Sequence, residues 1–414
     1  MTLYFKNVLA GLIAISLLTG CLNELEDNKD NSEAVVEDIV DGSKDESLCG
    51  PEHATAFSAQ ASGNSPMTVI RAADYGDGSH IEFIENGSVT QSGILASTET
   101  DYAVAGRGEY FYYMGRFGID TFQKYYYASP ESGLYQTQNN LGYSTREAGQ
   151  DSSPNATMIS FINSSTAILP RREENRAWVV NLDAQTESEF KICELDLSEY
   201  ATTATSDGVT TTYPPHMYLV NINENYAAIT MQRLEGYTPV KSAYVAIFDL
   251  NTWQEVDTNP AEDGLKGIEL NLKNIQGSSL SGNDLYLSSL LYSDNSGGIE
   301  KVSLENMTAS TINTEAGYSS VGVSNNGNIY AIRYNGWQDN GLYQINNNTS
   351  TEIDNTSGSY LTTLATNGND LWLGFGLSGE NQPKINVYNT INNVNIYTIN
   401  GLLRSPVDIT FIEK

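Results

Sequence analysis

From about Ser65 onward, short apolar strands alternate with polar turns along the chain. The stretch Asn225–Arg233 shows the unit, because a polar start leads into the run Tyr-Ala-Ala-Ile-Thr-Met and an arginine follows. Turns such as Ser281–Asn283, Asn326–Asn328 and Asn367–Asn369 contain Gly and Asn, which tolerate the positive φ of tight hairpins. The turns recur at intervals of roughly 40 to 60 residues, the length of a four-stranded propeller blade.

Six units contain all four strands in the expected order. The clearest has strands at Leu361–Ala365, Asp370–Phe375, Lys384–Asn389 and Asn395–Ile399. The unit before it has strands at Ser319–Ser324, Asn328–Tyr334, Gly341–Ile345 and Ser350–Ile353. The other four begin near Asp101, Ala156, His216 and Ile275.

The seventh unit is split between the two ends of the repeat region. Met67–Ala73, His80–Glu85 and Ser88–Ile94 supply three strands, and Pro406–Ile412 is a single alternating strand without a neighbour. Pairing Pro406–Ile412 inside Met67–Ala73 would close the ring and remove exposed strand edges. We therefore predict an all-β fold, a seven-bladed β-propeller of four-stranded antiparallel blades, with six or eight blades as alternatives.

Composition and motifs limit the classes of function that the protein can have. The formal net charge is -30 and the pI is near 4.2, whereas nucleic-acid binding needs clustered Lys and Arg, so we exclude a nucleic-acid partner. The three histidines, His53, His80 and His216, lack metal-ligand spacing, and no Gly-x-Ser-x-Gly elbow is present. Residues Asp74–Gly78 either wrap a calcium ion or form an ordinary turn. We predict a non-enzymatic protein with no catalytic residue, no metal and no cofactor.

The N-terminus carries the most specific motif. Lys6 precedes the apolar run Val8–Leu18, which is too short to span a membrane as a mature helix. The run ends in Leu-Thr-Gly-Cys at Cys21, which resembles the bacterial lipobox. The resemblance implies a signal peptide over residues 1–20 and acylation of Cys21 by diacylglycerol and palmitate, with membrane lipid as partner. Leu22 favours the outer membrane, facing the periplasm or the cell surface; an ordinary secretory signal is the alternative.

Residues 21–64 form the expected flexible acidic tether, and residues 65–414 form the propeller domain. From Glu24 to Glu46 there are ten acidic residues and two lysines, and such a segment buries too little apolar surface to fold. Cys49 and Cys193 would lie in an oxidising compartment. They either form a disulfide or remain two buried thiols.

The candidate site comes from aligning the ends of the second strands. These ends share an arginine or an aromatic ring, and six of the ten arginines stand there. The residues at the ends are Arg71, Arg116, Arg171, Arg172, Arg233, Tyr292, Arg333 and Phe375, with Tyr334 and Trp337 in the same loops. In a propeller they would gather on one face. There they either bind a bulky, planar or anionic ligand or pair with acidic residues and join the blades.

Three stretches resemble bacterial propeller lipoproteins: Glu109–Gly118 with Lys124-Tyr125, Ala177–Asn181 with Phe190–Leu197, and Ala243–Asp249 with Gly264–Gly267. With the lipobox, the architecture is similar to surface lipoproteins that partner TonB-dependent receptors and capture siderophores or cobalamin. The resemblance implies a small-molecule ligand and a receptor partner, but no individual ligand contact. A scaffold for protein partners in the cell envelope and a propeller hydrolase or lactonase are the alternatives.

Overall fold

The computed structural model describes residues 47–59, 67–74, 76–129, 133–136, 142–353 and 356–413. The expected signal peptide, Cys21 and the tether up to residue 46 lie outside these residues. In the part of the chain that is described, no helix is long and apolar enough to cross a membrane.

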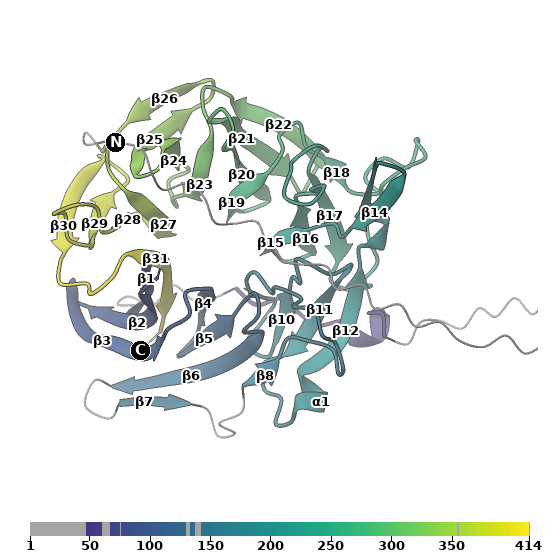
Figure 1. Ribbon diagram of the computed structural model, residues 1–414, viewed down its shortest axis with the longest axis horizontal. Coiled ribbons are helices and arrows are strands. Elements are labelled where there is room, and N and C mark those ends of the chain that lie inside the picture. The colour runs from purple at the N-terminus through teal and green to yellow at the C-terminus, as the bar shows by residue number, and fades with distance from the viewer. Residues whose placement is uncertain are drawn as a thin grey trace, which may run out of the picture. The chain divides into compact units, whose positions relative to one another are not determined.

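Seven antiparallel sheets, each built on four strands, form a ring, so the predicted seven-bladed β-propeller is confirmed (Figure 1). Blade 1 contains β31 (Pro406–Ile412), β1 (Met67–Asp74), β2 (Gly78–Glu85) and β3 (Ser88–Ser97), from the inner to the outer strand. Blade 2 contains β4 (Tyr102–Arg107), β5 (Tyr110–Gly115), β6 (Thr121–Ser129) and β7 (Gly133–Gln136), and β8 (Tyr143–Ser144) also pairs with β6.

The other five blades follow in chain order. Blade 3 contains β9 (Ser160–Phe161), β10 (Thr166–Leu169), β11 (Arg176–Asn181) and β12 (Lys191–Asp196), which follows the short helix α1 (Glu187–Phe190). Blade 4 contains β15 (Met217–Ile222), β16 (Tyr226–Met231), β17 (Tyr244–Asp249) and β18 (Ile268–Glu269). Blade 5 contains β19 (Ile275–Ser281), β20 (Asp284–Leu291), β21 (Ser296–Ser303) and β22 (Thr308–Asn313). Blade 6 contains β23 (Tyr318–Val323), β24 (Ile329–Gly336), β25 (Asp339–Asn346) and β26 (Thr349–Glu352), and blade 7 contains β27 (Leu361–Asn367), β28 (Asp370–Phe375), β29 (Lys384–Asn389) and β30 (Val394–Ile399).

The ring closes as the split seventh unit predicts. Strand β31 pairs antiparallel with β1, and the register places Met67 opposite Ile412. The connection that leads into β31 is held to blade 1 by two carboxylates: Asp74 accepts a hydrogen bond from the Ser405 hydroxyl, and Glu82 accepts one from the Leu403 backbone N–H at 2.9 Å. The first and last strands of the repeat region therefore share one blade.

Apolar side chains fill the spaces between neighbouring blades. Seven clusters of buried side chains are found among the described residues, one between each pair of neighbours around the ring. The alternation of each strand produces this, because one side of a strand faces the preceding blade and the other side faces the next. Polar side chains join the inner strands instead. Gly106 N–H donates to Thr410 at 2.7 Å and Asn221 donates to Ser278 at 2.9 Å.

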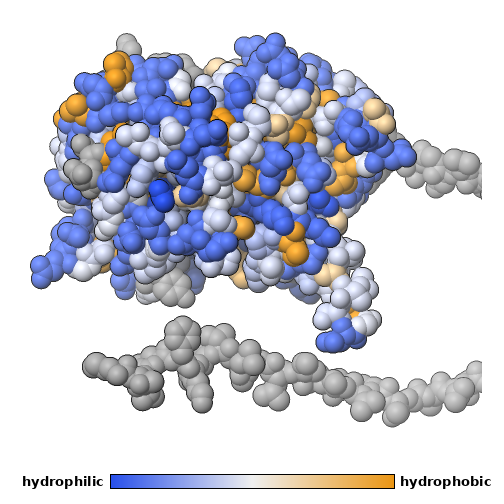
Figure 2. All heavy atoms as spheres, turned by 90° about the horizontal axis from the view of Figure 1, so that it is seen from above, coloured by the Kyte–Doolittle hydropathy of each residue, from blue (hydrophilic) through white to orange (hydrophobic). Residues whose placement is uncertain are grey.

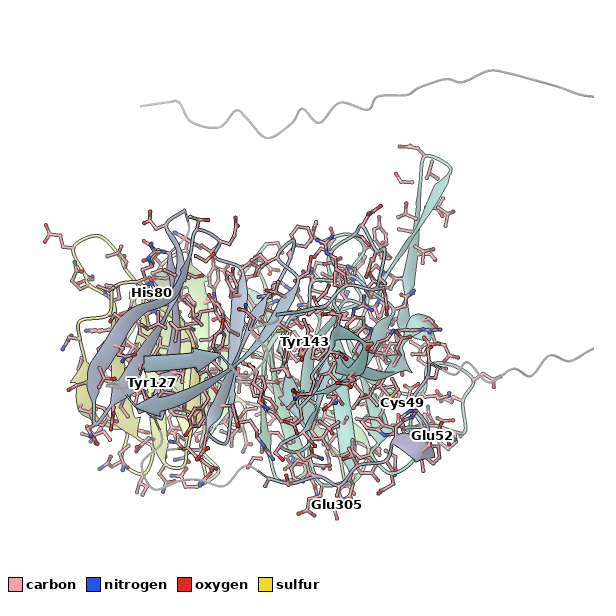
Figure 3. The ribbon with its side chains drawn as sticks, turned by 90° about the horizontal axis from the view of Figure 1, so that it is seen from below. Cys49, Glu52, His80, Tyr127, Tyr143 and Glu305 are labelled. Carbon is pink, nitrogen blue, oxygen red and sulfur yellow. A yellow bond between two sulfur atoms is a disulfide. The ribbon has the colours of Figure 1, made fainter. Side chains whose placement is uncertain are left out.

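The loops divide between two faces of the ring. The face made by the loops after each second strand, together with the connections from each outer strand to the next blade, is called here the second-strand face. The face made by the first hairpin of each blade is called the first-hairpin face. An unpredicted hairpin, β13 (Thr202–Ser206) with β14 (Val209–Tyr213), joins blade 3 to blade 4 and rises from the second-strand face (Figure 3).

Residues 47–59, called here the strap, lie against the propeller, whereas the sequence predicted a flexible tether up to residue 64. Leu48 forms a parallel bridge with Glu194 of β12, and Cys49 forms a disulfide with Cys193. After the short 3₁₀ helix Pro51–His53, the strap continues to blade 3, where the Ser58 N–H donates to the Ile162 carbonyl at 2.9 Å. A second 3₁₀ helix, Ser198–Tyr200, follows β12. Composition could not show the strap's position, because the partner strand lies more than a hundred residues away.

Candidate functional site

The second-strand residues occupy equivalent places in the ring. The second strands are β1, β5, β10, β16, β20, β24 and β28. Arg71, Arg333 and Phe375 lie within these strands, and Arg116, Arg171, Arg233 and Tyr292 follow them directly or within two residues. Tyr334 also lies in β24, and Trp337 lies in the turn that follows it. The predicted repeat therefore brings these residues to one face, but their contacts differ from blade to blade.

Arg71 joins the two strands that close the ring. It lies opposite Asp408 in the register of β1 with β31, and its Nε donates to the Asp408 carboxylate at 2.7 Å. Its Nη1 donates to the Thr100 carbonyl at 3.0 Å. The side chain is largely buried, so these contacts occupy a guanidinium that the sequence placed among the ligand contacts.

Arg171 is 2% exposed and is also occupied by the protein. Its Nε donates to the Thr145 carbonyl at 3.2 Å and its Nη2 donates to Gln150 at 2.8 Å. The guanidinium carbon lies 4.2 Å from the centre of the Trp178 ring. Burial lowers the pKa of Arg171, and Glu174 and Glu147 oppose this shift. The residue stabilises the packing of blade 3 beside blade 2.

Arg172 and Arg233 have partners in blades 3 and 4. Arg172 donates to Glu173 at 2.6 Å. Arg233 has a φ of 50°, donates to the Tyr200 carbonyl at 3.1 Å, and lies 4.8 Å from the centre of the Tyr244 ring. Glu173 is the residue next to Arg172, and the contacts of Arg233 are to a carbonyl and a ring. Both arginines are therefore occupied by the protein, but without the ion pairs between neighbouring blades that the sequence offered as the alternative to ligand binding.

Arg116 and Arg333 retain unused hydrogen-bonding capacity. Arg116 pairs with Asp101 at 3.4 Å, and Arg333 lies 5.5 Å from the centre of the Tyr343 ring. The Nε donor of each is buried and has no hydrogen-bond partner in the described structure. Because buried donors are nearly always paired, these two arginines are the members of the set best placed to gain from a bound acceptor.

The second-strand face carries four aromatic side chains of blades 5, 6 and 7, and we call Tyr292, Tyr334, Trp337 and Tyr360 the aromatic platform. The rings of Tyr292 and Tyr334 meet edge to face with centroids 5.3 Å apart. The rings of Trp337 and Tyr360 are 5.7 Å apart. Tyr292 is 58% exposed and Trp337 is 74% exposed, so both present ring surface to solvent.

Side-chain hydrogen bonds hold the loops of the aromatic platform together. Asn295 of blade 5 donates to the Asn335 carbonyl of blade 6 at 2.9 Å. Ser378 of blade 7 donates to Gln338 of blade 6 at 3.2 Å. The platform therefore rests on loops that are linked across two blade boundaries. The sequence missed Tyr360, because it precedes an inner strand and so falls outside the second-strand alignment.

Phe375 and the Asp74–Gly78 turn add less to this site. Lys384 of the next strand lies 4.9 Å from the centre of the half-buried Phe375 ring. The Asp74 carboxylate is engaged by Ser405, and Tyr75 lies outside the described residues. Among the residues that are described, no group of three or more His, Cys, Asp or Glu side chains could hold a metal ion.

Comparison with known proteins supports the fold. No family model matches the chain, and no curated protein matches it. Two solved structures from Bacteroides, both provisionally assigned as 6-phosphogluconolactonases, are similar. The protein from Bacteroides uniformis is 11% identical with a TM-score of 0.55, covering 84% of this chain and 100% of that chain. The one from Bacteroides fragilis is 12% identical with a TM-score of 0.53, covering 86% and 100%. Apo AztD from Citrobacter koseri is 11% identical, with a TM-score of 0.43 and coverage of 84% and 98%. At these identities the likeness concerns the fold alone.

Proposed function

We propose that the protein is a non-enzymatic, lipid-anchored binding protein of the bacterial outer membrane. It captures a small ligand with aromatic or anionic groups, such as a ferric siderophore or cobalamin, for uptake through a TonB-dependent receptor. The observation that carries the proposal is the aromatic platform, where two exposed rings lie on the same face of the ring as Arg333, whose Nε donor is unpaired in the described structure. Rings and a guanidinium together suit a planar or anionic ligand, because both stack and the guanidinium also pairs with acidic oxygens.

Export from the cytoplasm has support that is separate from the lipobox. Cys49 and Cys193 form a disulfide, and disulfides persist in oxidising compartments such as the periplasm and the cell surface. The likeness to the two Bacteroides proteins concerns the fold only, so it gives a lactonase no advantage over a binding protein.

Tryptophan emission offers a direct test, because only one of the four tryptophans is exposed. Trp337 is 74% exposed, whereas Trp178, Trp253 and Trp372 are exposed by 3%, 3% and 6%. Acrylamide should therefore quench mainly the emission of Trp337. The quenched part of the emission should be absent from a Trp337→Phe variant. A ligand on the aromatic platform should protect Trp337 from the quencher.

The mature protein would be titrated with a ferric hydroxamate, a ferric catecholate and cyanocobalamin. We expect one of them to bind at micromolar concentration, with at least a tenfold weaker Kd in Trp337→Ala and in Arg333→Gln. Tyr397→Ala is the matched control, since Tyr397 is a partly exposed ring on the outer strand β30. If no probe binds, or if the Trp337 variant binds as well as the wild type, capture at the platform is refuted.

A scaffold role is the second candidate, and the distribution of exposed apolar side chains favours it. Thirteen large apolar side chains are exposed among the residues that the structure describes, and eight of them belong to the second-strand face or its hairpin. They are Phe117, Val209, Tyr237, Val240, Tyr292, Trp337, Leu377 and Leu403. By contrast, the side of the ring seen in Figure 2 is mostly hydrophilic, with apolar residues in small separate patches. A stoichiometric protein complex that is lost in both Trp337→Ala and Leu403→Ser, with no small ligand bound, would establish this alternative.

A further inference from the structure

A cavity on the first-hairpin face lies apart from the aromatic platform. Its volume is about 410 Å³, within the range of small-molecule sites. It is lined by Arg107, Glu109 and Tyr110 of the first hairpin of blade 2, Lys124 of β6, Asp183 of blade 3 and Glu413 after β31, with Ala59, Gly108 and Ser164 between them. The cavity therefore stands where three consecutive blades and the strap meet.

The two cations of the cavity are held in place by the protein. Arg107 donates through Nη2 to the carbonyl and the hydroxyl of Ser58 in the strap. Lys124 donates to the Leu182 carbonyl at 3.1 Å and to Asp183 at 3.0 Å, and its Nζ lies 4.3 Å from the centre of the Tyr110 ring. Both positive groups are thus fixed before any ligand arrives, which lowers the entropic cost of binding.

Two of the three carboxylates that line the cavity, those of Glu109 and Glu413, are held less firmly than the cations. Backbone pairing anchors the end of the chain, because the Glu413 N–H donates to the Gly108 carbonyl at 2.7 Å. Glu109 is exposed and Glu413 is half-buried. Within the described structure, neither carboxylate accepts a hydrogen bond. Arg107 and Glu413 line the same cavity. Burial lowers the pKa of Arg107, and Tyr112 and Glu413 oppose this shift.

Charges of both signs limit the class of ligand. A ligand with only an anionic group would face three carboxylates in a protein of net charge -30, and a ligand with only a cationic group would face Arg107 and Lys124. A ligand that carries both charges can place each against its opposite. We propose that this cavity binds a small zwitterion of the size of a short peptide, with its carboxylate on Arg107 and Lys124 and its ammonium group on Glu109 and Glu413. The site is independent of the proposed capture at the aromatic platform.

The probes for this site differ by a single charge. Alanyl-alanine carries both charges, N-acetyl-alanyl-alanine carries only the carboxylate, and alanyl-alanine amide carries only the ammonium group. We expect calorimetric titration of the mature protein at low ionic strength to give a measurable Kd for alanyl-alanine. The affinity for each single-charge analogue should be at least tenfold weaker. Equal binding of all three probes, or no binding of alanyl-alanine at 10 mM, would overturn the proposal.

Charge-neutralising variants place the site in the cavity. Glu109→Gln should weaken alanyl-alanine binding at least fivefold without affecting folding, since the side chain is exposed and makes no contact that the fold needs. Arg107→Gln should weaken alanyl-alanine binding at least tenfold. If loss of the contact with Ser58 unfolds the strap in this variant, the result for Glu109→Gln tests the site by itself. Glu305→Gln is the matched control, because Glu305 is exposed on the same face in the last turn of blade 5 (Figure 3). An equal loss of affinity for alanyl-alanine in Glu305→Gln would show that only the overall charge of the protein affects binding, and would refute the placement of the site in the cavity.

Discussion

The disulfide between Cys49 and Cys193 should be a large single contribution to the stability of the propeller. It joins the strap to β12 across a sequence separation of 144 residues. The perturbation is the double variant Cys49→Ser with Cys193→Ser, which removes the covalent link and keeps side chains of similar size. The other strap contacts, among them the bond from the Trp253 indole N–H to the His53 carbonyl at 2.9 Å, stay in place.

The expected loss of stability in the double variant follows from the length of the loop that the disulfide closes. In the chain-entropy account, a loop of 144 residues restricts the unfolded chain by about 5 kcal/mol at 25 °C. At an unfolding entropy of about 2.1 cal/mol/K per residue, a unit spanning Asp45–Lys414 should melt about 6 °C lower without the link. The effect acts on the unfolded state, so the folded structure should change little.

Differential scanning calorimetry of the wild type and the double variant, with and without reductant, measures this effect. Reductant should lower the melting temperature of the wild type to that of the variant and should leave the variant unchanged. Trp253→Phe is the control for strap contacts, since it removes a hydrogen bond worth about 1 kcal/mol together with some buried ring volume and keeps the disulfide. A shift below about 1 °C in the double variant would refute the reasoning, because the strap would then not restrict the unfolded chain.

Two further predictions concern buried ionisable groups. Burial, together with the charge of Arg172, lowers the pKa of His216 to about 4, so the stability from its neutral ring is complete above about pH 6.5 and is lost as the pH falls toward 4. The free energy of unfolding should fall by about 3 kcal/mol over this range. In His216→Asn, where Asn tolerates the φ of 53°, the midpoint of urea unfolding should depend less on pH. The same pH dependence in the variant and the wild type would contradict this prediction. The fully buried Glu300 accepts hydrogen bonds from the N–H groups of Asn271 and Leu272 at 3.0 and 3.1 Å, so Glu300→Gln should cost about 1–3 kcal/mol in urea unfolding. Glu305 is exposed, so Glu305→Gln should leave the free energy of unfolding unchanged. Equal stability of the two variants would show that the hydrogen bonds of Glu300 do not stabilise the fold.

The strand pattern was readable from the sequence because it is local. Alternating apolar residues and Gly or Asn turns define strands such as β16 and β28 without reference to distant residues. The closing strand was also predictable, because Pro406–Ile412 alternates but has no neighbour in the chain, and ring closure leaves it one place. The hairpin β13–β14 was missed, since its mainly polar, threonine-rich strands face solvent and carry little apolar alternation.

The role of each arginine depended on the tertiary structure. The sequence placed Arg71 and Arg333 at equivalent ends of second strands, and the structure keeps that equivalence. What separates them is the neighbour: Arg71 meets Asp408, 337 residues later in the chain, whereas Arg333 has a buried donor with no partner. A periodic pattern specifies which face a side chain reaches, but the ion pair it forms depends on which distant segment folds beside it. The sequence alone therefore determined the propeller and the shared face, and only the folded ring decided which arginines of the set keep a buried donor without a partner.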